Sequence, residues 1–343
     1  RLKNEQLQVS EEALRPYFPL PRVLAGLFTV LGRLYGVRIV ANAGVEVYHP
    51  DVKFFDVLDR NGTPRGGFFL DLYARPKKRG GAWMDECVGR IRTAEASALP
   101  IAYLVCNFSP AAGEQPSLLT HHEVLTLFHE FGHGLHHMLT RVDEPSVSGI
   151  HGVEWDAVEL PSQFMENFAW EWEVLQLLTE HVDTGEKLPR ALFDKMIAAR
   201  NFLSGFYTMR QIEFSLFDMR LHGGPPPATE RAVMAQLDEI RREVAVLQPP
   251  EYNRFPHAFS HIFAGGYAAG YYSYKWAEVL SADAFSAFER EGVFNADTGR
   301  RFRQAILAQG GSRPAAELFR EFMGRDPSPE ALLRHSGLLD AAA

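Results

Sequence analysis

The sequence predicts a mainly helical α+β fold with a small antiparallel β-sheet near the N-terminal third. Short β-type segments separated by turn signals lie between residues 45 and 106, and an almost continuous helical pattern runs from residue 120 onward. No linker-like stretch separates these two parts. We therefore expect a single domain over residues 1–343, with an α+β section at 1–119 and a helical section at 120–343.

The N-terminal section begins with helical sequence. Residues 1–40 contain an apolar stretch from Val23 to Tyr35, and Pro21 suits the first turn of a helix. Further along, Asn61-Gly62 marks a tight turn between two strands. The predicted strands are 45–48, 53–58, 68–73 and 101–106.

The C-terminal section is predicted to be helical almost throughout. The predicted helices are 121–139, 160–179, 188–221, 229–246, 265–291, 298–309, 313–322 and 328–336. A Gly-Gly-Pro-Pro-Pro run at 223–227 ends one helix and precedes the next, because neither residue type continues a helix well.

The composition is that of an ordinary folded protein. Hydrophobic residues make up 46% and charged residues 23%, which excludes wholesale disorder, and the 25 phenylalanines favour a large core. The 43 acidic residues outnumber the 35 basic ones, for a formal charge of -8. Nucleic acids and anionic membrane surfaces attract positively charged proteins, whereas this chain is negatively charged, so we expect neither as a partner.

The two cysteines bear on the cellular setting. Cys87 and Cys106 cannot form a disulfide framework, so a reducing, cytoplasmic setting is expected. No apolar run approaches the ~18 to 20 residues of a membrane span, and the N-terminal residues lack the pattern of a signal peptide. Because the chain does not begin with methionine, a fragment or a processed product is an alternative to a whole protein.

The strongest motif is His129-Glu130-Phe131-Gly132-His133, which has the His-Glu-x-x-His spacing of the zincins. On a helix, positions i and i+4 lie about 40° apart around the axis and ~6 Å apart along it, so both histidines can bind one Zn²⁺ ion. Glu130 points about 100° away from His129 and can act as a general base toward a metal-bound water. The motif predicts a zincin-like helical domain with one zinc ion, and a chance match on a soluble helix is the alternative.

The residues after the motif narrow the class. His136 lies about 10 Å further along the helix than His129, too far to bind the same ion. We expect His136 and His137 to support a ligand or to lie on the surface. The metzincin pattern requires Gly at position 136 and His at position 139, whereas this chain has His136 and Leu139, so that class is disfavoured.

A catalytic zinc site needs a third protein ligand, and the downstream candidates are acidic. They are Glu154, Asp156, Glu159 and Glu166. Glu159 precedes Pro161, which can start a helix, and Glu166 lies seven residues later on the same helical face. One of these two is expected to bind the metal and the other to hold a ligand in place. Either could instead cap a helix or pair with a surface base.

Two segments, Phe128–His133 and Asp156–Asn167, together resemble the thimet oligopeptidase family of zinc metallopeptidases. Their amino-acid sequences most resemble the oligopeptidase A branch of that family. The resemblance extends from about residue 5 to the end of the chain. It reaches only the C-terminal half of such enzymes, and the N-terminal half that forms the opposite wall of a deep channel has no counterpart here. In that family the Glu of the Val-Glu-x-Pro-Ser-Gln segment is the third zinc ligand, which implies Glu159.

A tyrosine-rich segment is the second candidate for chemistry. Tyr267, Tyr271 and Tyr274 are spaced i, i+4 and i+7, so on a helix their rings would share one stripe, and an aromatic core face is the alternative. A phenol is a neutral donor that can hydrogen-bond a developing oxyanion, and Gly265-Gly266 permits a hinge or a close backbone approach. The family resemblance implies that His261, Tyr267 and Tyr274 face the zinc, with Tyr271 nearby.

Two further candidates concern the substrate. Ser146–Gly152, which contains Gly149, is either a mobile flap that pairs with an extended peptide or a solvated connector. Arg254 is either a group that binds a substrate carboxylate or a surface cation.

Together these residues predict a zinc-dependent endopeptidase for short, unstructured oligopeptides. Zinc would carry a water in its fourth position, Glu130 would take the proton as this water attacks, and His261 with a tyrosine would stabilise the oxyanion. The alternatives are a non-catalytic zinc-binding fragment, which would expose apolar surface where a missing half docks, a dipeptidyl carboxypeptidase, and an amidohydrolase of non-peptide substrates. Two histidines and one carboxylate suit zinc better than cobalt or manganese.

Overall fold

The computed structural model describes residues 7, 9–94, 97–111 and 113–339. It begins with α2 (Glu11–Leu14), the 3₁₀ turn η1 (Arg15–Tyr17) and α3 (Leu20–Tyr35). Pro21 lies in the first turn of α3 as predicted, and Gly36 ends the helix in the left-handed conformation, with a φ of 67°. Most of the first eight residues of the predicted helical region lie outside the described residues.

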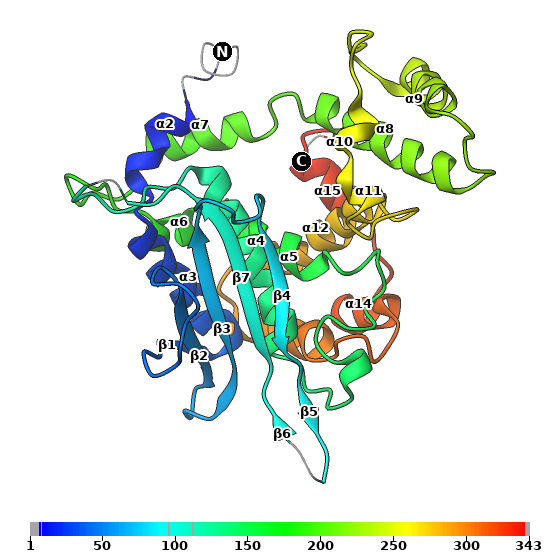
Figure 1. The fold of residues 1–343 in the computed structure, drawn as a ribbon. Helices are drawn as coiled ribbons and strands as arrows, with labels where there is room; N and C mark the ends of the chain where they lie inside the picture. Colours follow the sequence, from blue (N-terminus) through cyan, green and yellow to red (C-terminus); the bar gives the residue numbers. More distant parts are fainter. Residues whose placement is uncertain (1–6, 8, 95–96, 112, 340–343) are drawn as a thin grey trace.

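Five described strands form one sheet in the N-terminal third (Figure 1). They are β1 (Val37–Ala41), β2 (Lys53–Asp59), β3 (Pro64–Tyr73), β4 (Trp83–Val88) and β7 (Ile101–Phe108). Their spatial order is β1-β2-β3-β7-β4, and β3 and β7 run parallel while the other neighbours are antiparallel. The small sheet is confirmed, but it is mixed rather than antiparallel. Strand β7 lies between β3 and β4 and runs parallel to β3.

Two details of the sheet differ from the prediction. Residues 45–48 are not a strand: Gly44 and Pro50 flank the segment, and Tyr48 donates a hydrogen bond to Oδ2 of Asp71 at 3.0 Å. Strand β1 includes residues 37–40, where the helical prediction for residues 1–40 was wrong because Gly36 ends α3, and β4 was not predicted either. A short hairpin of β5 (Ile91–Arg92) and β6 (Ser97–Ala98) extends beyond the sheet (Figure 1).

The helical section begins with α4 (His121–Met138), as predicted. Thr120 and Glu123 form a reciprocal capping box at its start, which satisfies backbone N–H groups of the first turn. The predicted helix 160–179 is divided into α5 (Leu160–Phe168) and α6 (Trp172–Leu178). At the break, the carbonyl of Ala169 accepts a hydrogen bond from Nε2 of His121 at 2.9 Å instead of a helical one.

Two more predicted helices are interrupted. Residues 188–221 form α7 (Arg190–Arg200) and α8 (Ser204–His222), which part at Leu203, whose φ is 60°. Helix α9 (Glu230–Val244) follows as predicted. The predicted helix 265–291 starts only at α12 (Ser273–Glu291), after the single turns α10 (Phe255–Ala258) and α11 (Ser260–Phe263).

Residues 264–272 form an irregular loop rather than the predicted helix. Asp218, which is fully buried on α8, accepts hydrogen bonds from the backbone N–H groups of Ala269 and Tyr271 at 2.9 and 2.8 Å. Ala269 has a φ of 56°. A buried carboxylate from a distant helix therefore replaces the carbonyl partners that a helix would supply.

The described chain ends in short helices near the predicted positions. They are α13 (Ala296–Phe302), the π-helical turn η3 (Arg303–Leu307), α14 (Ala315–Met323) and α15 (Glu330–His335). None of the described helices is long and apolar enough to cross a membrane.

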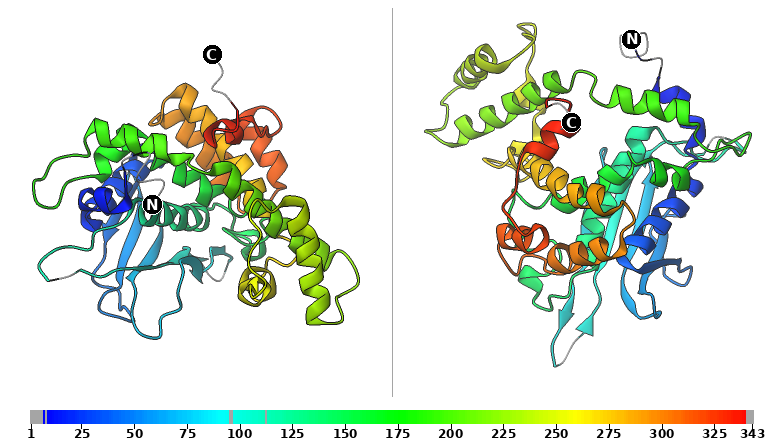
Figure 2. Two further views of the ribbon diagram at one scale, coloured as in Figure 1. Left: turned by 90° about the horizontal axis from the view of Figure 1, so that it is seen from above. Right: turned by 180° about the vertical axis from the view of Figure 1, so that it is seen from behind.

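The buried apolar side chains of the described residues form two clusters. The larger one joins α3, the sheet and helices α4 to α7 with α12, and it is rich in phenylalanine, as where Phe164 stacks on Phe302 at 3.9 Å. The smaller one joins α8 and α9 to the segment before α12. Figure 2 shows α8 and α9 projecting from the rest of the molecule.

The backbones of α4 and α5 touch at Gly132. A Cβ atom at this position would lie 2.3 Å from the carbonyl oxygen of Pro161 and 2.4 Å from Cα of Ser162. Only glycine permits so close an approach without a shift of one helix. This contact brings the start of α5 against the middle of α4.

Candidate metal centre

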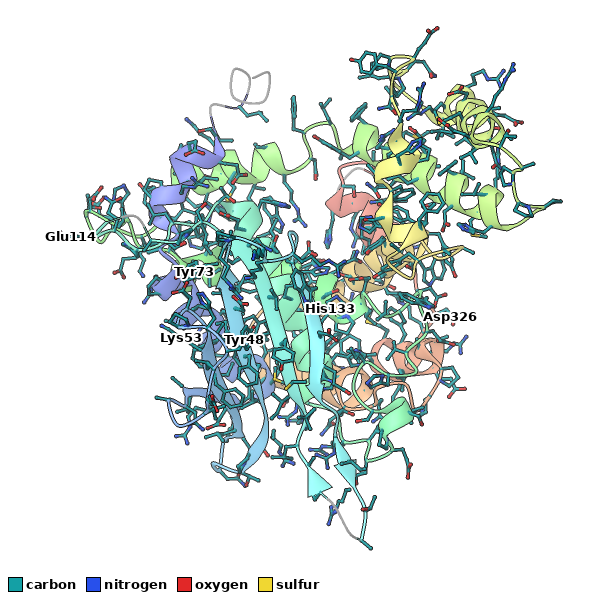
Figure 3. The ribbon with its side chains drawn as sticks, viewed as in Figure 1. Tyr48, Lys53, Tyr73, Glu114, His133 and Asp326 are labelled. Carbon is teal, nitrogen blue, oxygen red and sulfur yellow. The ribbon has the colours of Figure 1, made fainter. Side chains whose placement is uncertain are left out.

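Three potential metal ligands meet where α4 contacts the start of α5. His129 and His133 lie one turn apart on α4, and Glu159 directly precedes α5. Nε2 of His129 lies 3.2 Å and Nε2 of His133 3.1 Å from Oε2 of Glu159. Ligand atoms of the three residues all lie within 4.8 Å of one another, and no other group of His, Cys, Asp or Glu does so in the part of the chain that the structure describes. Figure 3 labels His133 near the middle of the molecule.

Neighbouring side chains hold two of these three potential ligands, His129 and Glu159. Oε1 of Glu166 lies 2.7 Å from Nδ1 of His129, on the side of the ring opposite the shared carboxylate. Ser162 donates a hydrogen bond to Oε2 of Glu159 at 2.9 Å, and Tyr267 donates one to Oε1 at 2.7 Å. A carboxylate on the outer nitrogen of a ligating histidine is the usual arrangement around a bound metal, because it sets the tautomer and the ring orientation.

Burial and charge compete in this cluster. Burial alone would raise the pKa of Glu159, but the charges and hydrogen bonds of His133 and His129 outweigh it and hold the pKa well below its usual value. Burial would lower the pKa of His129, but hydrogen bonds to Glu159 and Glu166 raise it well above the usual value. Metal ligands bind deprotonated, so a divalent cation would replace the proton that His129 holds toward Glu159.

Glu130 follows His129 on α4, and its carboxylate is not one of the three potential ligands. Its side chain is buried, with 4% of the residue exposed, and Oε2 has no hydrogen-bond partner among the described residues. Burial raises the pKa of this carboxyl group, and the nearby His129 and His133 oppose the rise. A buried carboxylate oxygen without a partner costs free energy, so a bound cation or a molecule held by it would satisfy this atom. The residues present therefore fit a metal site with a reacting carboxylate next to it.

The tyrosine segment reaches the same place without forming a helical stripe. Tyr267 and Tyr274 stack with their ring centroids 4.8 Å apart, and the exposed ring of His261 lies 6.4 and 6.1 Å from them. Burial, followed by the charge of Glu159, raises the pKa of both phenols, so both stay protonated donors at neutral pH. Tyr271 points elsewhere: its hydroxyl donates to Oε1 of Gln211 at 3.0 Å, and its ring packs in the smaller core cluster.

His136 and His137, which follow the motif on α4, are buried rather than on the surface. Burial lowers the pKa of His136 to about 3, so this imidazole is neutral. Nε2 of His137 donates to the carbonyl of Val88 at 3.0 Å, and this contact ties α4 to β4. Neither belongs to the ligand cluster.

The structure places the other acidic and substrate candidates away from the cluster. Oε2 of Glu154 accepts a hydrogen bond from the backbone of Ala315 at 2.8 Å, and Asp156 is not in the cluster either. Arg254 is exposed and donates to the carbonyl oxygen of Glu251 at 2.7 Å, within its own loop.

The segment 146–152 is buried at its centre and exposed at both ends. Ser148 is buried, and a Cβ atom at Gly149 would lie 2.6 Å from Nδ1 of His137. The N–H of Gly311 donates to the carbonyl of Val147 at 3.0 Å, and His151 pairs with Glu86 of β4 at 2.9 Å. The segment is therefore held on several sides.

Two residues of the site were not predicted from the sequence. Ser162 lies three residues after Glu159, a spacing that could have suggested a contact at a helix start. The half-exposed Trp155 packs edge-on against Tyr267 with centroids 4.7 Å apart, and no local pattern indicates this contact.

Comparisons with known proteins identify relatives of the whole chain. Residues 1–338 match peptidase family M3. Oligopeptidase A of Escherichia coli (strain K12) is 55% identical over 337 residues, which cover 98% of this chain and 50% of that protein. Dipeptidyl carboxypeptidase of the same organism is 37% identical over 351 residues, covering 98% and 50%. The chain spans about half the length of these curated relatives and corresponds to the C-terminal part of oligopeptidase A.

A solved structure with low sequence identity shares the fold. The M32 carboxypeptidase of Deinococcus radiodurans R1 superposes with a TM-score of 0.54 at 18% identity, over 95% of this chain and 60% of that chain. At this identity the likeness shows the fold alone, which is the mostly helical fold of metallopeptidases with a small mixed sheet.

Proposed function

Because the chain belongs to peptidase family M3, we propose that it is a zinc-dependent endopeptidase that hydrolyses short, unstructured oligopeptides. The observation that carries the proposal is the convergence of His129, His133 and Glu159, with the unpaired carboxylate oxygen of Glu130 beside them. One ion per chain would be held by the two Nε2 atoms and one oxygen of Glu159. Catalytic zinc in peptidases is bound by two imidazoles and one carboxylate and keeps one coordination position open.

Zinc, when bound, would polarise the scissile carbonyl and acidify the attacking water. Glu130 takes the proton from that water and delivers it to the leaving amine, a role that requires a carboxylate without another partner. Glu166 holds His129 by its Nδ1–H, so that Nε2 faces the metal.

The tyrosines and His261 would act on the other side of the substrate. The phenol of Tyr267 donates to Glu159 and so positions this ligand, and the phenol of Tyr274 stacks beside it. A neutral phenol or imidazole that faces the scissile carbonyl stabilises the negative charge that develops on its oxygen. We assign this function to Tyr274 and His261, and to Tyr267 when its single O–H turns from Glu159 to the substrate.

The substrate class rests on the relatives. Oligopeptidases act on peptides, and the half-exposed ring of Trp155, which packs against Tyr267, offers an apolar contact for a peptide side chain beside the cluster. The similarity to a dipeptidyl carboxypeptidase keeps release of C-terminal dipeptides as the second candidate activity. We also propose that residues 1–343 form one catalytic unit, and a cytoplasmic setting agrees with the free thiols of Cys87 and Cys106.

Glu130→Gln is the decisive variant. It should keep one zinc ion per chain, because Glu130 is not a ligand, and should cleave a quenched fluorescent peptide ~10² to 10⁴ times more slowly. Glu173→Gln, the same change on the exposed surface of α6, should leave the rate unchanged. Full activity of Glu130→Gln would refute the assignment of the base.

The ligands can be tested separately. His129→Ala, His133→Ala and Glu159→Ala should each lose stoichiometric zinc. If Glu159→Ala retained zinc while Glu166→Ala lost it, the third ligand would be Glu166. Peptide cleavage by the wild-type chain with and without a chelator separates the enzyme from a non-catalytic fragment, since the fragment would bind zinc and cleave nothing.

A further inference from the structure

A second concave site lies away from the metal cluster. It is a pocket of about 430 Å³ between the end of α3, the turn from β2 to β3, the segment after α4, and the helices α13 and η3. None of its lining residues belongs to the metal cluster or to the tyrosine segment. Its volume lies in the range of small-molecule sites, ~300 to 1,000 Å³.

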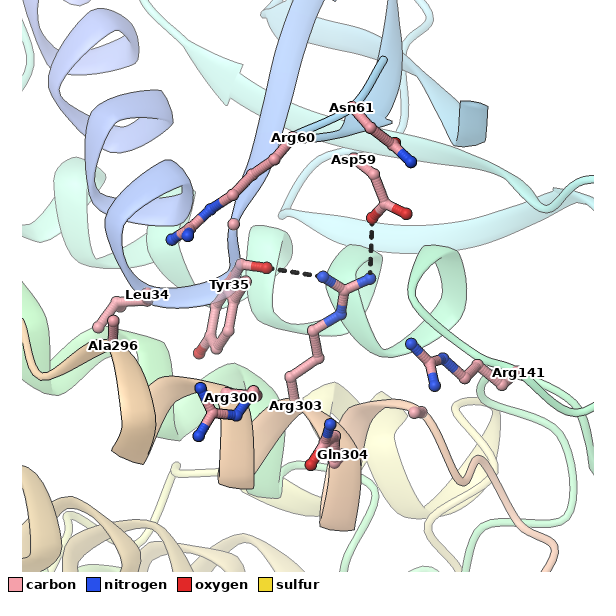
Figure 4. A pocket seen from close by; sticks show the side chains of 12 residues that line it. Leu34, Tyr35, Asp59, Arg60, Asn61, Arg141, Ala296, Arg300, Arg303 and Gln304 are labelled. Carbon is pink, nitrogen blue, oxygen red and sulfur yellow. Dashed lines mark hydrogen bonds and ion pairs between the residues drawn. The ribbon is translucent and has the colours of Figure 1, made fainter. Parts of the chain in front are cut away.

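Four arginines from three separate segments of the chain line this pocket. They are Arg60, Arg141, Arg300 and Arg303, and Figure 4 shows the first three surrounding Arg303. The single carboxylate of the lining is Asp59, and it is already engaged by two guanidinium groups: Nη2 of Arg303 lies 3.3 Å from Oδ1, and Nε of Arg65 donates to Oδ2 at 2.5 Å. The lining therefore carries an excess of positive charge in a chain whose formal charge is -8.

Two of the arginines have unused donors. The guanidinium groups of Arg60 and Arg141 have no hydrogen-bond or ion-pair partner in the described part of the chain. Arg300 pairs with Asp297 at 2.7 Å, and both of these side chains are mostly exposed, so that pair is weak. Each guanidinium offers a planar fork of donors that matches a phosphate or carboxylate group.

The scaffold holds the arginines together against their mutual repulsion. Nη1 of Arg303 donates to the carbonyl of Tyr35 at 2.7 Å, at the C-terminal end of α3, where a cation is favoured. Burial, with the neighbouring charges of Arg141 and Arg65, lowers the pKa of Arg303. The side chain of Arg60 lies over Gly36, where a Cβ atom would come within 2.9 Å of its Nε. Arg303 also begins a π-helical turn, a distortion that is frequent at functional sites.

We infer that this arginine-lined pocket binds a small polyanion that carries two or more phosphate groups. Like charges gathered in a concave site attract an anion and raise its local concentration. Guanidinium groups on opposite walls match a ligand with more than one anionic group, because a single phosphate cannot reach donors on every wall. The simplest ligand with this chemistry is pyrophosphate, and a nucleoside triphosphate is a larger source of the same group. The apolar side chains of Leu34 and Ala296 leave room beside the arginines for a larger moiety.

Binding is measured by isothermal titration of the full chain at low ionic strength with pyrophosphate, ATP and citrate. The chain is titrated both as isolated and after treatment with a chelator, because phosphates also bind zinc. We expect one site per chain for pyrophosphate and ATP, unchanged by the chelator, and at least tenfold weaker binding of citrate. Tighter binding of ATP than of pyrophosphate would identify a nucleotide as the source of the polyphosphate, and equal binding would identify the polyphosphate group alone.

Arg60→Gln and Arg141→Gln should each weaken binding at least tenfold. Neither side chain has a partner to lose among the residues that the structure describes, so both variants should unfold at the wild-type temperature. Arg242→Gln, which removes a charge from the exposed face of α9, should bind as the wild type does. The inference is overturned if no binding saturates up to ~1 mM ligand, if the chelator abolishes binding, or if Arg242→Gln weakens it as much as the pocket variants do. None of these readouts depends on peptide cleavage.

Discussion

Gly132→Ala tests whether the contact between α4 and α5 holds the metal centre together. The new Cβ atom would lie 2.3 Å from the carbonyl oxygen of Pro161 and 2.4 Å from Cα of Ser162, whereas ordinary contacts begin at 3.4 Å. Both of these atoms belong to the backbone, so no side chain can move aside. The start of α5 must therefore move away from α4 by about 1 Å, and Glu159, which directly precedes α5, moves with it.

The expected loss follows from the tolerance of metal coordination. Distances between a metal and its ligands are confined to about ±0.2 Å, so a displacement of ~1 Å removes one of the three ligands from its position. We expect the affinity for zinc to fall at least ~100-fold, which corresponds to ~2.7 kcal/mol of binding free energy. Overpacking should also lower the free energy of unfolding of the metal-free chain by about 1–3 kcal/mol.

The assay is competition for zinc against a chromophoric chelator, together with urea unfolding of the metal-free chain. Gly26→Ala is the matched control, because its Cβ would lie 2.6 Å from the carbonyl oxygen of Leu177, away from the metal centre. It should lose stability and keep its zinc affinity. Gly80→Ala, with nothing within 4 Å of the new Cβ, should change neither. Wild-type zinc affinity in folded Gly132→Ala, or an equal loss in Gly26→Ala, would refute the reasoning.

Three further changes test other contacts. Glu166→Ala removes the carboxylate that holds Nδ1 of His129 and should weaken zinc binding at least ~10-fold in the same competition assay; an unchanged affinity would show that this contact does not orient the ligand. Burial alone would raise the pKa of Asp71, but hydrogen bonds from Arg75 and Lys78 outweigh it and lower the pKa, so the carboxylate stabilises the fold above its unfolded pKa of ~3.9. The difference in unfolding free energy between wild type and Asp71→Asn, measured in urea, should therefore shrink as the pH falls below ~4, and a constant difference would contradict this. Phe164→Ala should lower the free energy of unfolding by about 3–5 kcal/mol, because its fully buried ring stacks on Phe302 at 3.9 Å, and a loss below ~1 kcal/mol would show that the core closes around the gap.

Features that depend on neighbouring residues could be predicted from the sequence. Helix α4 follows from its apolar periodicity, and the pairing of His129 with His133 follows from the geometry of one helical turn. The start of α3 at Pro21 and the strands on either side of Asn61-Gly62 follow from local backbone preferences.

Other expectations failed where a distant residue changes the local preference. The spacing of Tyr267, Tyr271 and Tyr274 indicates a helix, but the buried carboxylate of Asp218 stabilises an irregular loop in its place. Tyr267 therefore reaches Glu159 while Tyr271 turns into the core. The order of the strands likewise depends on long-range pairing, which placed β7 parallel to β3.

By itself, the sequence determined which side chains of α4 share one face and that a carboxylate must come from farther along the chain. The tertiary structure decided that Glu159 meets both imidazoles while Glu166 contacts the outer nitrogen of His129. It also gathered four arginines from three separate segments around one pocket. The physical reason is the range of the interactions: a helical turn is set by residues four apart, whereas these contacts depend on how closely whole elements pack, as at Gly132.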